Sequence, residues 1–238
     1  VTPTDNCLRI APELRELVKC SGRFSRKLEE IRGIESGSVT VGSYPSVSIQ
    51  WLPHVIKAFR ADYPGIRIQI REGIRQELQS WLDDGSVEMC FYTERPGMKG
   101  EWIPLADDPI MAVLPKDHPL AHAPSYPLAR CAEEDFIMPA LGRDEDVAAV
   151  LEEAGISPRI VFSTIENFAA ISMIECGLGM SIMNELITKC RTLDAAIIPL
   201  DPPRAIHFGI AYPSAEKLSP AALEFISYAK RMIPELRG

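Results

Sequence analysis

Residues 5–35 carry apolar side chains at alternating spacings of three and four, which predicts one long amphipathic helix. Thr4 or Asp5 can cap its start, and Pro12 is expected to kink its first turns because proline lacks a backbone N–H. A seam this narrow is typical of a helix that pairs with a second chain, although it could instead fold back on its own domain. We therefore expect a dimer. The seam, with Ser21 as its polar interruption, consists of Cys7, Ile10, Leu14, Leu17, Ser21, Phe24, Leu28 and Ile31.

From residue 37 onward the hydrophobic pattern changes to alternating strands and helices. The first set predicts strands at 39–42, 66–70 and 87–92, with helices at 47–62 and 76–82. A second set repeats this order, with strands at 136–138, 159–163 and 180–183 and helices at 144–154 and 166–176. Such alternation is typical of a parallel sheet covered by helices. The sequence therefore predicts an α/β protein with two Rossmann-like lobes, preceded by a long N-terminal helix.

Two strand-like passages, near 111–115 and 205–211, are expected to cross between the lobes. Two separate short strands are expected at 102–105 and 110–114. A final helix begins near Ser219, followed by a proline that suits the first helical position. Its buried face is expected to contain Leu223, Ile226, Ala229, Met232 and Ile233. A cleft between lobes joined in this way is a favoured small-molecule site and can close by a hinge motion.

A small polar turn at 42–46 lies between the first strand and the first helix of the sheet region. Ser43, Ser46 and Ser48 therefore lie where backbone N–H groups and the helix dipole attract an anion. In open α/β sheets, ligands bind outside the carboxyl ends of the strands. The alternative is that these serines only cap the helix and fill the turn. The pattern alone leaves both interpretations open.

The composition excludes several classes of protein. With 46% hydrophobic and 24% charged residues, the chain has globular rather than disordered composition. No apolar run reaches the roughly 18 residues of a membrane span, and the N-terminus lacks a signal-peptide pattern, so we expect a cytoplasmic protein. Residues 1–36 carry seven Lys/Arg and six Asp/Glu, so the acidic excess lies in the remainder of the chain. That acidic remainder should repel nucleic-acid phosphates.

Neither a metal site nor a catalytic site is indicated by the spacing of reactive residues. The six cysteines are scattered, with no Cys-x-x-Cys and no histidine at ligand spacing, so we expect no disulfide framework, metal or cofactor. The four histidines are also scattered, and no serine lies in a Gly-x-Ser-x-Gly elbow. Glu94 and Glu166 could in principle meet across the cleft, but sequence cannot show that an acid and a base converge. We expect that the protein is not an enzyme.

Several fragments together resemble the regulatory part of LysR-type transcriptional regulators. Residues 1–5 resemble the Leu-Thr-x-Ala-Gly segment that follows the family's winged helix-turn-helix, although Thr4 and Asp5 replace its Ala-Gly. The helix at 5–35 matches the dimerising linker helix, and residues 36–42 are similar to the first sensor strand. Further fragments recur at the family's spacing, namely Leu52-Pro53, Phe59-Arg60, Tyr63-Pro64, Gly85-x-Val-Glu, His118-Pro-Leu-Ala and Gly177-Leu-Gly.

This resemblance implies a type 2 periplasmic-binding-protein-like fold that holds a small effector between its lobes. Ile74 lies where members that bind carboxylates often carry threonine, which weakens any inference of the same ligand. Arg143 and Asn167 are nearby polar candidates that could equally be surface or capping residues, and His207 lies near the crossing strand. The effector-site positions implied are Ser43, Tyr44, Pro45, Ser46, Ile74, Tyr92, Thr93, Pro139, Ala140, Leu141, Thr164, Ile165 and Phe208.

The resemblance also implies a domain plan and a set of partners. We expect a linker and dimerisation helix at 1–36, a first regulatory lobe at 37–112 and 208–238, and a second at 113–207. The helix would pair through Ile10, Leu14, Leu17, Phe24, Leu28 and Ile31 in a homodimer or homotetramer. Promoter DNA would be contacted only through a DNA-reading domain that precedes Val1 and is missing here, and no membrane contact is expected.

The expected function is therefore to sense a small, anionic metabolite and to modulate transcription. The alternative is a solute-binding protein of a transport system, which would share the predicted lobes. A transport protein would be expected to carry an export signal, and its function would leave the heptad seam unexplained.

Overall fold

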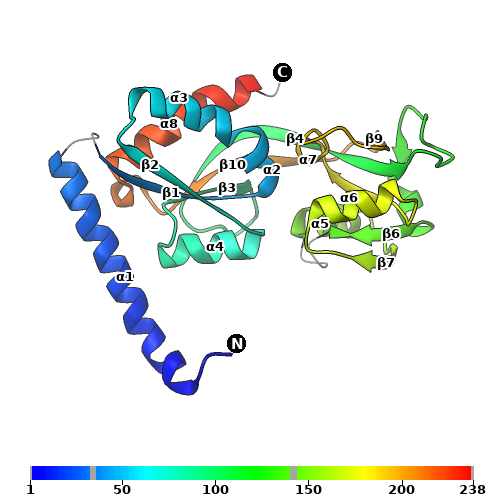
Figure 1. The fold of residues 1–238 in the computed structure, drawn as a ribbon. Helices are drawn as coiled ribbons and strands as arrows, with labels where there is room; N and C mark the ends of the chain where they lie inside the picture. The colour runs from blue at the N-terminus through cyan, green and yellow to red at the C-terminus, as the bar shows by residue number, and fades with distance from the viewer. Residues whose placement is uncertain (1, 33–35, 140–143, 237–238) are drawn as a thin grey trace. The chain divides into compact units, whose positions relative to one another are not determined.

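The structure, a computed structural model, describes residues 2–32, 36–139 and 144–236, and within the first of these ranges it leaves several side chains undescribed. The chain divides into two compact units (Figure 1). The first unit consists of Val1–Tyr44, Trp51–Leu105 and Gly209–Gly238, and the second of Pro45–Gln50 and Ala106–Phe208.

Two strands, β4 (Glu101–Pro115) and β10 (Ala205–Tyr212), contain residues of both units. The predicted plan of two α/β lobes joined by two crossing strands is thus confirmed. The chain changes unit between residues 105 and 106 and between 208 and 209, compared with the expected changes at 112/113 and 207/208. The short segment Pro45–Gln50 belongs to the second unit, which the sequence pattern does not indicate.

The N-terminal helix α1 (Asp5–Arg32) is continuous and runs through Pro12. Thr4 caps its start, because the Thr4 Oγ1 accepts a hydrogen bond from the Cys7 N–H at 3.3 Å. Leu28 and Ile31 fall within the helix, but their side chains lie outside the described part of the structure. The other apolar seam residues predicted to pair are all at least half exposed, namely Ile10, Leu14, Leu17 and Phe24.

The sheet of the first unit has the strand order β2-β1-β3-β10-β4. Its first three strands are β1 (Gly37–Ser43), β2 (Ile66–Glu72) and β3 (Met89–Thr93). β1 lies in the middle and pairs in parallel with both neighbours, so the three strands end at the same edge of the sheet. At that edge Ser43 is in register with Glu72 on one side and with Phe91 on the other.

Helices cover both faces of this sheet. Within the first unit, α3 (Leu52–Asp62) and α8 (Pro220–Leu236) lie on one face and α4 (Arg75–Asp84) on the other (Figure 1). Aromatic rings join α3 to α8, since the Phe59 ring centroid lies 5.3 Å from that of Phe225 and 5.5 Å from that of Tyr228. These edge-to-face contacts are the arrangement that aromatic rings prefer in a core.

The predicted helix at 47–62 is two helices, α2 (Pro45–Gln50) and α3, which are separated at Trp51. The break follows from Pro53, which has no backbone N–H to continue a helix but suits the first turn of a new one. The apolar stripe is nevertheless correct, because Leu52, Val55 and Phe59 are fully buried.

The second unit contains a parallel pair of strands, β6 (Asp135–Met138) and β7 (Arg159–Ser163). It also contains β8 (Ser181–Asn184) and β9 (Ala195–Asp201), which both pair antiparallel with β4, and β5 (Tyr126–Pro127), which pairs in parallel with β9. Its helices are α5 (Glu145–Glu153), α6 (Asn167–Glu175) and α7 (Glu185–Thr188), with the short 3-10 helix η1 (Leu128–Ala132). A second 3-10 helix, η3 (Ala215–Lys217), belongs to the first unit.

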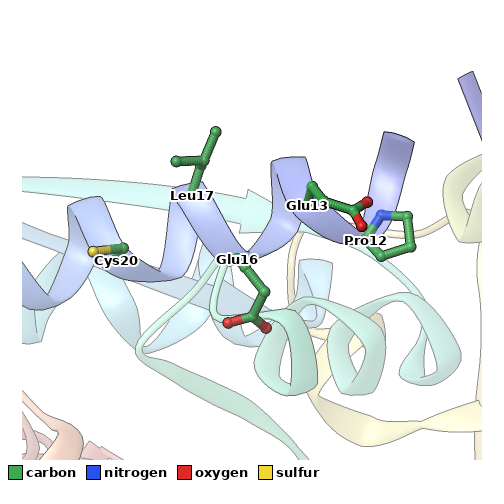
Figure 2. Close-up of a pocket in the computed structure, with 5 residues that line it drawn as sticks. All are labelled: Pro12, Glu13, Glu16, Leu17 and Cys20. Atoms are coloured by element: carbon green, nitrogen blue, oxygen red, sulfur yellow. The ribbon is translucent and has the colours of Figure 1, made fainter. Parts of the chain in front are cut away.

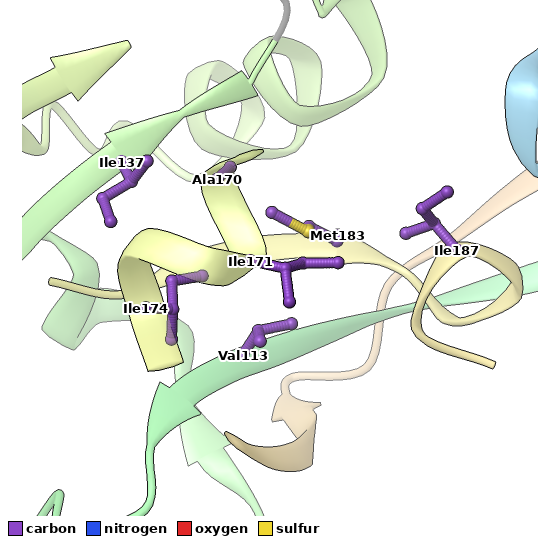
Figure 3. Close-up of a cluster of buried hydrophobic side chains, with 7 residues drawn as sticks. All are labelled: Val113, Ile137, Ala170, Ile171, Ile174, Met183 and Ile187. Carbon is purple, nitrogen blue, oxygen red and sulfur yellow. The ribbon is translucent and has the colours of Figure 1, made fainter. Parts of the chain in front are cut away.

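The core of the second unit forms where α6 packs onto the strands. Three residues of this helix, Ala170, Ile171 and Ile174, are completely buried. They point toward side chains from β4, β6 and β8 (Figure 3), so one apolar helix face closes the unit. The full cluster is Val113, Ile137, Ala170, Ile171, Ile174, Met183 and Ile187.

The two short strands predicted at 102–105 and 110–114 are one long strand, β4. The acidic pair between them does not break the strand, because both carboxylates have partners in the second unit. Asp107 lies 2.6 Å from the His207 Nδ1, and the buried Asp108 accepts hydrogen bonds from the Asn184 Nδ2 at 2.7 Å and from the Leu186 N–H at 3.2 Å. Asp108 thereby caps α7.

The predicted start of the final helix is confirmed, because the Ser219 Oγ accepts a hydrogen bond from the Ala222 N–H at 3.1 Å. The prediction that Leu223 lies on the buried face is wrong, since this residue is 43% exposed. The buried face instead turns through Ala222 and Phe225. None of the helices in the described part of the chain is both long and apolar enough to cross a membrane.

We predict that Ile171→Ala lowers the free energy of unfolding by about 2–5 kcal/mol, because it leaves a cavity among fully buried side chains. Leu178→Ala is the matched control in the same unit, since Leu178 is 45% exposed and its truncation should cost less than about 0.5 kcal/mol. Urea denaturation followed by circular dichroism measures both. Equal losses in the two variants would contradict the assignment of this core.

Candidate functional site

The carboxyl ends of β2, β1 and β3 are tied together in the first unit. The Gly73 N–H, just after β2, donates to the Ser43 carbonyl at 3.3 Å. The Tyr44 N–H, just after β1, donates to the Phe91 carbonyl at 3.1 Å. The segments that follow the strands therefore start from fixed points along one sheet edge. This is the edge at which open α/β sheets bind their ligands.

Ser43 lies at the end of β1 and is completely buried. Its hydroxyl donates to the Tyr44 carbonyl at 3.0 Å, so its proton is already used within the turn. The helix that follows, α2, has only six residues and begins at Pro45, which has no N–H to offer an anion. Neither feature strengthens the hypothesis that the Ser43–Ser46 turn holds an anion through the helix dipole.

Tyr44, Tyr92 and Thr93 lie close together at the same edge. The Tyr44 hydroxyl lies 3.4 Å from the Thr93 Oγ1, and the rings of Tyr44 and Tyr92 have centroids 6.5 Å apart. Thr93 and Tyr92 are buried, whereas Tyr44 is half-buried. Two hydroxyl groups and two aromatic rings thus come from the ends of adjacent strands.

Tyr92 is fixed by the helix below it. Its hydroxyl donates to the Gln79 Oε1 at 2.8 Å, and burial raises the pKa of this phenol, although the neighbouring Arg75 charge opposes the rise. The phenol therefore stays protonated and remains a hydrogen-bond donor throughout the physiological pH range. Tyr92 acts as a rigid wall rather than as a titrating group.

Arg75 is a residue of this site that the sequence pattern did not single out. It occupies the first position of α4, directly after the predicted site residue Ile74, and is only 9% exposed. Its Nη1 donates to the Thr93 carbonyl, and its guanidinium lies 5.0 Å from the centroid of the Tyr92 ring. The sequence held one signal that could have found Arg75. A positive charge in the first turn of a helix is disfavoured by the helix dipole, so an arginine at this position indicates a role other than helix stabilisation.

Ile74 lies in the first unit, where it is half-buried at the N-cap of α4. The remaining predicted site residues belong to the second unit or lie outside the described part of the chain. Ser46 and Phe208 are buried, and Pro45 is half-buried. Ala140 and Leu141, like the nearby candidate Arg143, lie outside the described residues. Pro139, Thr164 and Ile165 follow the ends of β6 and β7, as expected.

Two details distinguish the residues after β6 and β7. The Thr164 N–H donates to the Met138 carbonyl at 3.2 Å, and the Thr164 Oγ1 accepts from the Glu166 N–H at 3.4 Å. The Thr164 backbone is thus tied to the end of β6, and its side chain bonds within its own turn. Ile165 is 54% exposed, so it offers an apolar surface.

The geometry of the two units agrees with a family comparison. The family model of the LysR substrate binding domain matches residues 32–233, which is most of the chain. The chain belongs to the LysR substrate-binding domain family. The two-unit α/β fold of this LysR domain is accordingly that of the family's effector-binding domains, and its resemblance to LysR-type regulators is confirmed.

One curated relative and two solved structures illustrate what this LysR domain is similar to. YvbU of Bacillus subtilis, an uncharacterized HTH-type transcriptional regulator, is 27% identical over 231 residues, or 96% of this chain and 79% of YvbU. The effector binding domain of QuiR in complex with shikimate superimposes with a TM-score of 0.76, at 18% identity over 84% of this chain and 99% of that domain. The Synechocystis PCC6803 CcmR regulatory domain in complex with 2-PG gives a TM-score of 0.75, at 20% identity over 83% of this chain and 98% of that domain.

A pocket of about 590 Å³ lies elsewhere in the chain, along α1. Figure 2 shows that all of its labelled lining residues belong to that one helix. A pocket with a single helix for its wall lacks the convergent polar groups of a ligand site. The lining residues are Pro12, Glu13, Glu16, Leu17 and Cys20, and none of them is a predicted effector residue.

The buried cysteines of this LysR domain are poorly suited to thiol chemistry. Burial raises the pKa of Cys131 to about 12 and also raises that of Cys90, which keeps both thiols protonated at physiological pH. Within the ranges that the structure describes, no three His, Cys, Asp or Glu side chains are grouped to bind a metal ion. The described residues at the strand ends of the first unit offer hydrogen-bonding groups, aromatic rings and the Arg75 guanidinium.

We predict that Ser43→Glu destabilises this LysR domain by on the order of 3 kcal/mol, because it places a carboxylate where the native side chain is fully buried. Ser43→Ala is the control and should cost only about 1 kcal/mol, for the lost hydrogen bond to the Tyr44 carbonyl. Thermal and urea denaturation without ligand measure the difference. If both variants were equally stable, the end of β1 would have room that its burial does not suggest.

Proposed function

We propose that this chain is the effector-sensing part of a LysR-type DNA-binding transcriptional regulator. In this proposal the strand ends of the first unit bind a small metabolite and thereby modulate transcription. The observation that carries the proposal lies at the carboxyl ends of the parallel strands, where the Tyr44 hydroxyl lies 3.4 Å from the Thr93 hydroxyl and the Arg75 guanidinium donates to the Thr93 carbonyl. A few convergent polar groups beside aromatic rings are typical of small-molecule sites.

The named relatives support a sensor rather than a transporter or an enzyme. YvbU is named as a transcriptional regulator, and QuiR and CcmR have been solved with shikimate and 2-PG respectively. Shikimate carries a carboxylate, which agrees with the expectation that the effector here is an anionic metabolite. The other predicted effector residues, in the second unit, remain part of this proposal.

A sensor must bind its effector with different affinity in two conformations. Coupling energies between sites are typically about 1–3 kcal/mol, so modest differences in contact are sufficient. The acidic excess outside residues 1–36 disfavours direct contact with the phosphate backbone of DNA. We therefore assign contacts with promoter DNA to a separate DNA-reading domain of the regulator.

The test of effector binding is a thermal-shift screen of the chain against shikimate, benzoate, small dicarboxylates and amino acids. A ligand present at 100 times its dissociation constant should stabilise the protein by about 2.7 kcal/mol. Thr93→Val should reduce the shift of any ligand found, because it removes one hydroxyl while it preserves the shape of the side chain. Thr192→Val, which changes an exposed threonine of the second unit, should leave the shift unchanged.

The same screen has an outcome that counts against the proposal. If ligands stabilised the Thr93→Val variant as strongly as the native chain, binding would occur elsewhere than at these strand ends. A folded protein that no member of the panel stabilised would also contradict small-molecule sensing by these residues.

We further propose that α1 pairs with the same helix of a second copy to form the homodimer, which could assemble further into a homotetramer. Ile10, Leu14 and Leu17 recur at alternating spacings of four and three and are exposed in the single chain. Exposed apolar side chains in a heptad seam gain free energy when a partner helix covers them.

We predict that Leu17→Lys weakens self-association, because it places a charge inside the seam. Leu8→Lys is the matched control, since Leu8 is also a strongly exposed leucine of α1 but lies outside the seam. Sedimentation equilibrium over a range of concentrations measures the effect, and the dissociation constant should rise at least about tenfold in Leu17→Lys alone. Identical oligomeric states for both variants would count against pairing through this seam.

A further inference from the structure

Arg75 is positively charged and nine-tenths buried in the first turn of α4. Two general costs attach to this position. The N-terminal end of a helix repels a cation, and a buried guanidinium loses its hydration. Glu77, in the same turn, accepts a hydrogen bond from the Ile74 N–H at 3.0 Å, so the usual acidic complement of a helix start is supplied by another side chain. Arg75 is therefore not needed to cap this helix.

The structure holds the Arg75 guanidinium in a defined position. Its Nη1 donates to the carbonyl of Thr93 at the end of β3. The guanidinium carbon, Cζ, lies 5.0 Å from the centroid of the Tyr92 ring, whose face attracts the cation. Tyr92 is itself held by the hydrogen bond from its hydroxyl to Gln79. A preorganised guanidinium loses less entropy for each hydrogen bond that it makes to a ligand.

The groups around Arg75 define a chemical class of ligand. The hydroxyl groups of Tyr44 and Thr93 lie 3.4 Å apart, and the Thr93 carbonyl that Arg75 contacts belongs to the same residue as one of them. The planar guanidinium fork matches two oxygens of a carboxylate or phosphate, and hydroxyl groups can donate to the same oxygens. The rings of Tyr44 and Tyr92 provide an apolar wall for the rest of the molecule.

We propose that Arg75 is the residue that selects an anionic effector, by binding its carboxylate or phosphate oxygens together with the hydroxyl groups of Tyr44 and Thr93. This inference rests on the proposed effector-sensing function and specifies the class of ligand. It moves the anion-recognising group from the Ser43–Ser46 turn to the start of α4. The competing role is purely structural, in which Arg75 only ties α4 to the end of β3.

The test compares charged probes with neutral analogues of the same shape. Isothermal titration calorimetry of the full chain would use benzoate against benzamide and succinate against succinamide, with inorganic phosphate as a third anion. In the native chain at least one anion should bind about tenfold or more tightly than its amide, as expected for charge-assisted hydrogen bonds. Arg75→Gln should remove this preference, and Arg75→Lys should retain part of it because the charge remains without the fork.

Arg71→Gln is the matched control for these variants. Arg71 is also an arginine of the first unit whose guanidinium lies over an aromatic ring, 4.1 Å from the centroid of Trp81, but it is exposed on β2. Its loss should leave the preference for anions unchanged. Thermal unfolding without ligand checks that each variant folds, and Arg75→Lys keeps the test interpretable if Arg75→Gln does not fold.

The outcomes separate this inference from the proposed function. An undiminished anion preference in folded Arg75→Gln would overturn the role of Arg75 and leave small-molecule sensing in place. A native chain that binds amides as tightly as anions would have the same consequence. Binding of neither anions nor amides by the native chain would contradict both. A purely structural Arg75 would lower the melting temperature in the variants without changing the ratio of anion to amide affinity.

Discussion

The parallel pairing of β1 with both β2 and β3 is the constraint on which the candidate site depends. Ser43 is in register with Glu72 and with Phe91, so the residues just beyond those strands leave the sheet side by side. A slip of one residue in either pairing would turn alternate side chains to the opposite face. Tyr44 and Arg75 can each contact Thr93 only because both registers are kept, and the core residues of β1 are buried only in the same arrangement.

The parts of this fold that sequence could predict are those specified by local periodicity. The heptad spacing of α1 is a property of neighbouring residues, and so are the glycines at which helices of this fold end. Gly85 has a φ of 75°, and Gly177 ends α6 in the same left-handed conformation, with a φ of 74°. The strand–helix alternation between such stops was sufficient to predict parallel strands, and hence which strand ends a ligand would meet.

The features that sequence did not predict depend on distant partners. The pattern at 102–114 predicted two short strands, yet β4 is continuous, and the Asp108 carboxylate within it is bonded by Asn184 and Leu186, which lie far away in the sequence. Arg75 also depends on distant partners, and the resemblance pointed to its neighbour Ile74 instead. Nothing local to Arg75 shows that β3 brings a carbonyl and a tyrosine ring to it. Which side chains contact each other between distant elements is decided by the tertiary fold and not by the local sequence.

The electrostatics of Arg75 suggest how a bound anion would bias the domain. The helix dipole disfavours a cation at the first position of α4 by about 0.3–1 kcal/mol, and burial of the guanidinium adds to this cost. An anion beside Arg75 would be attracted both by the side-chain charge and by the same end of the helix. Two terms that oppose each other without the anion would therefore act together with it. A conformation that brings an anion to Arg75 gains this free energy and other conformations do not, and such a difference is what an effector needs to shift an equilibrium between states.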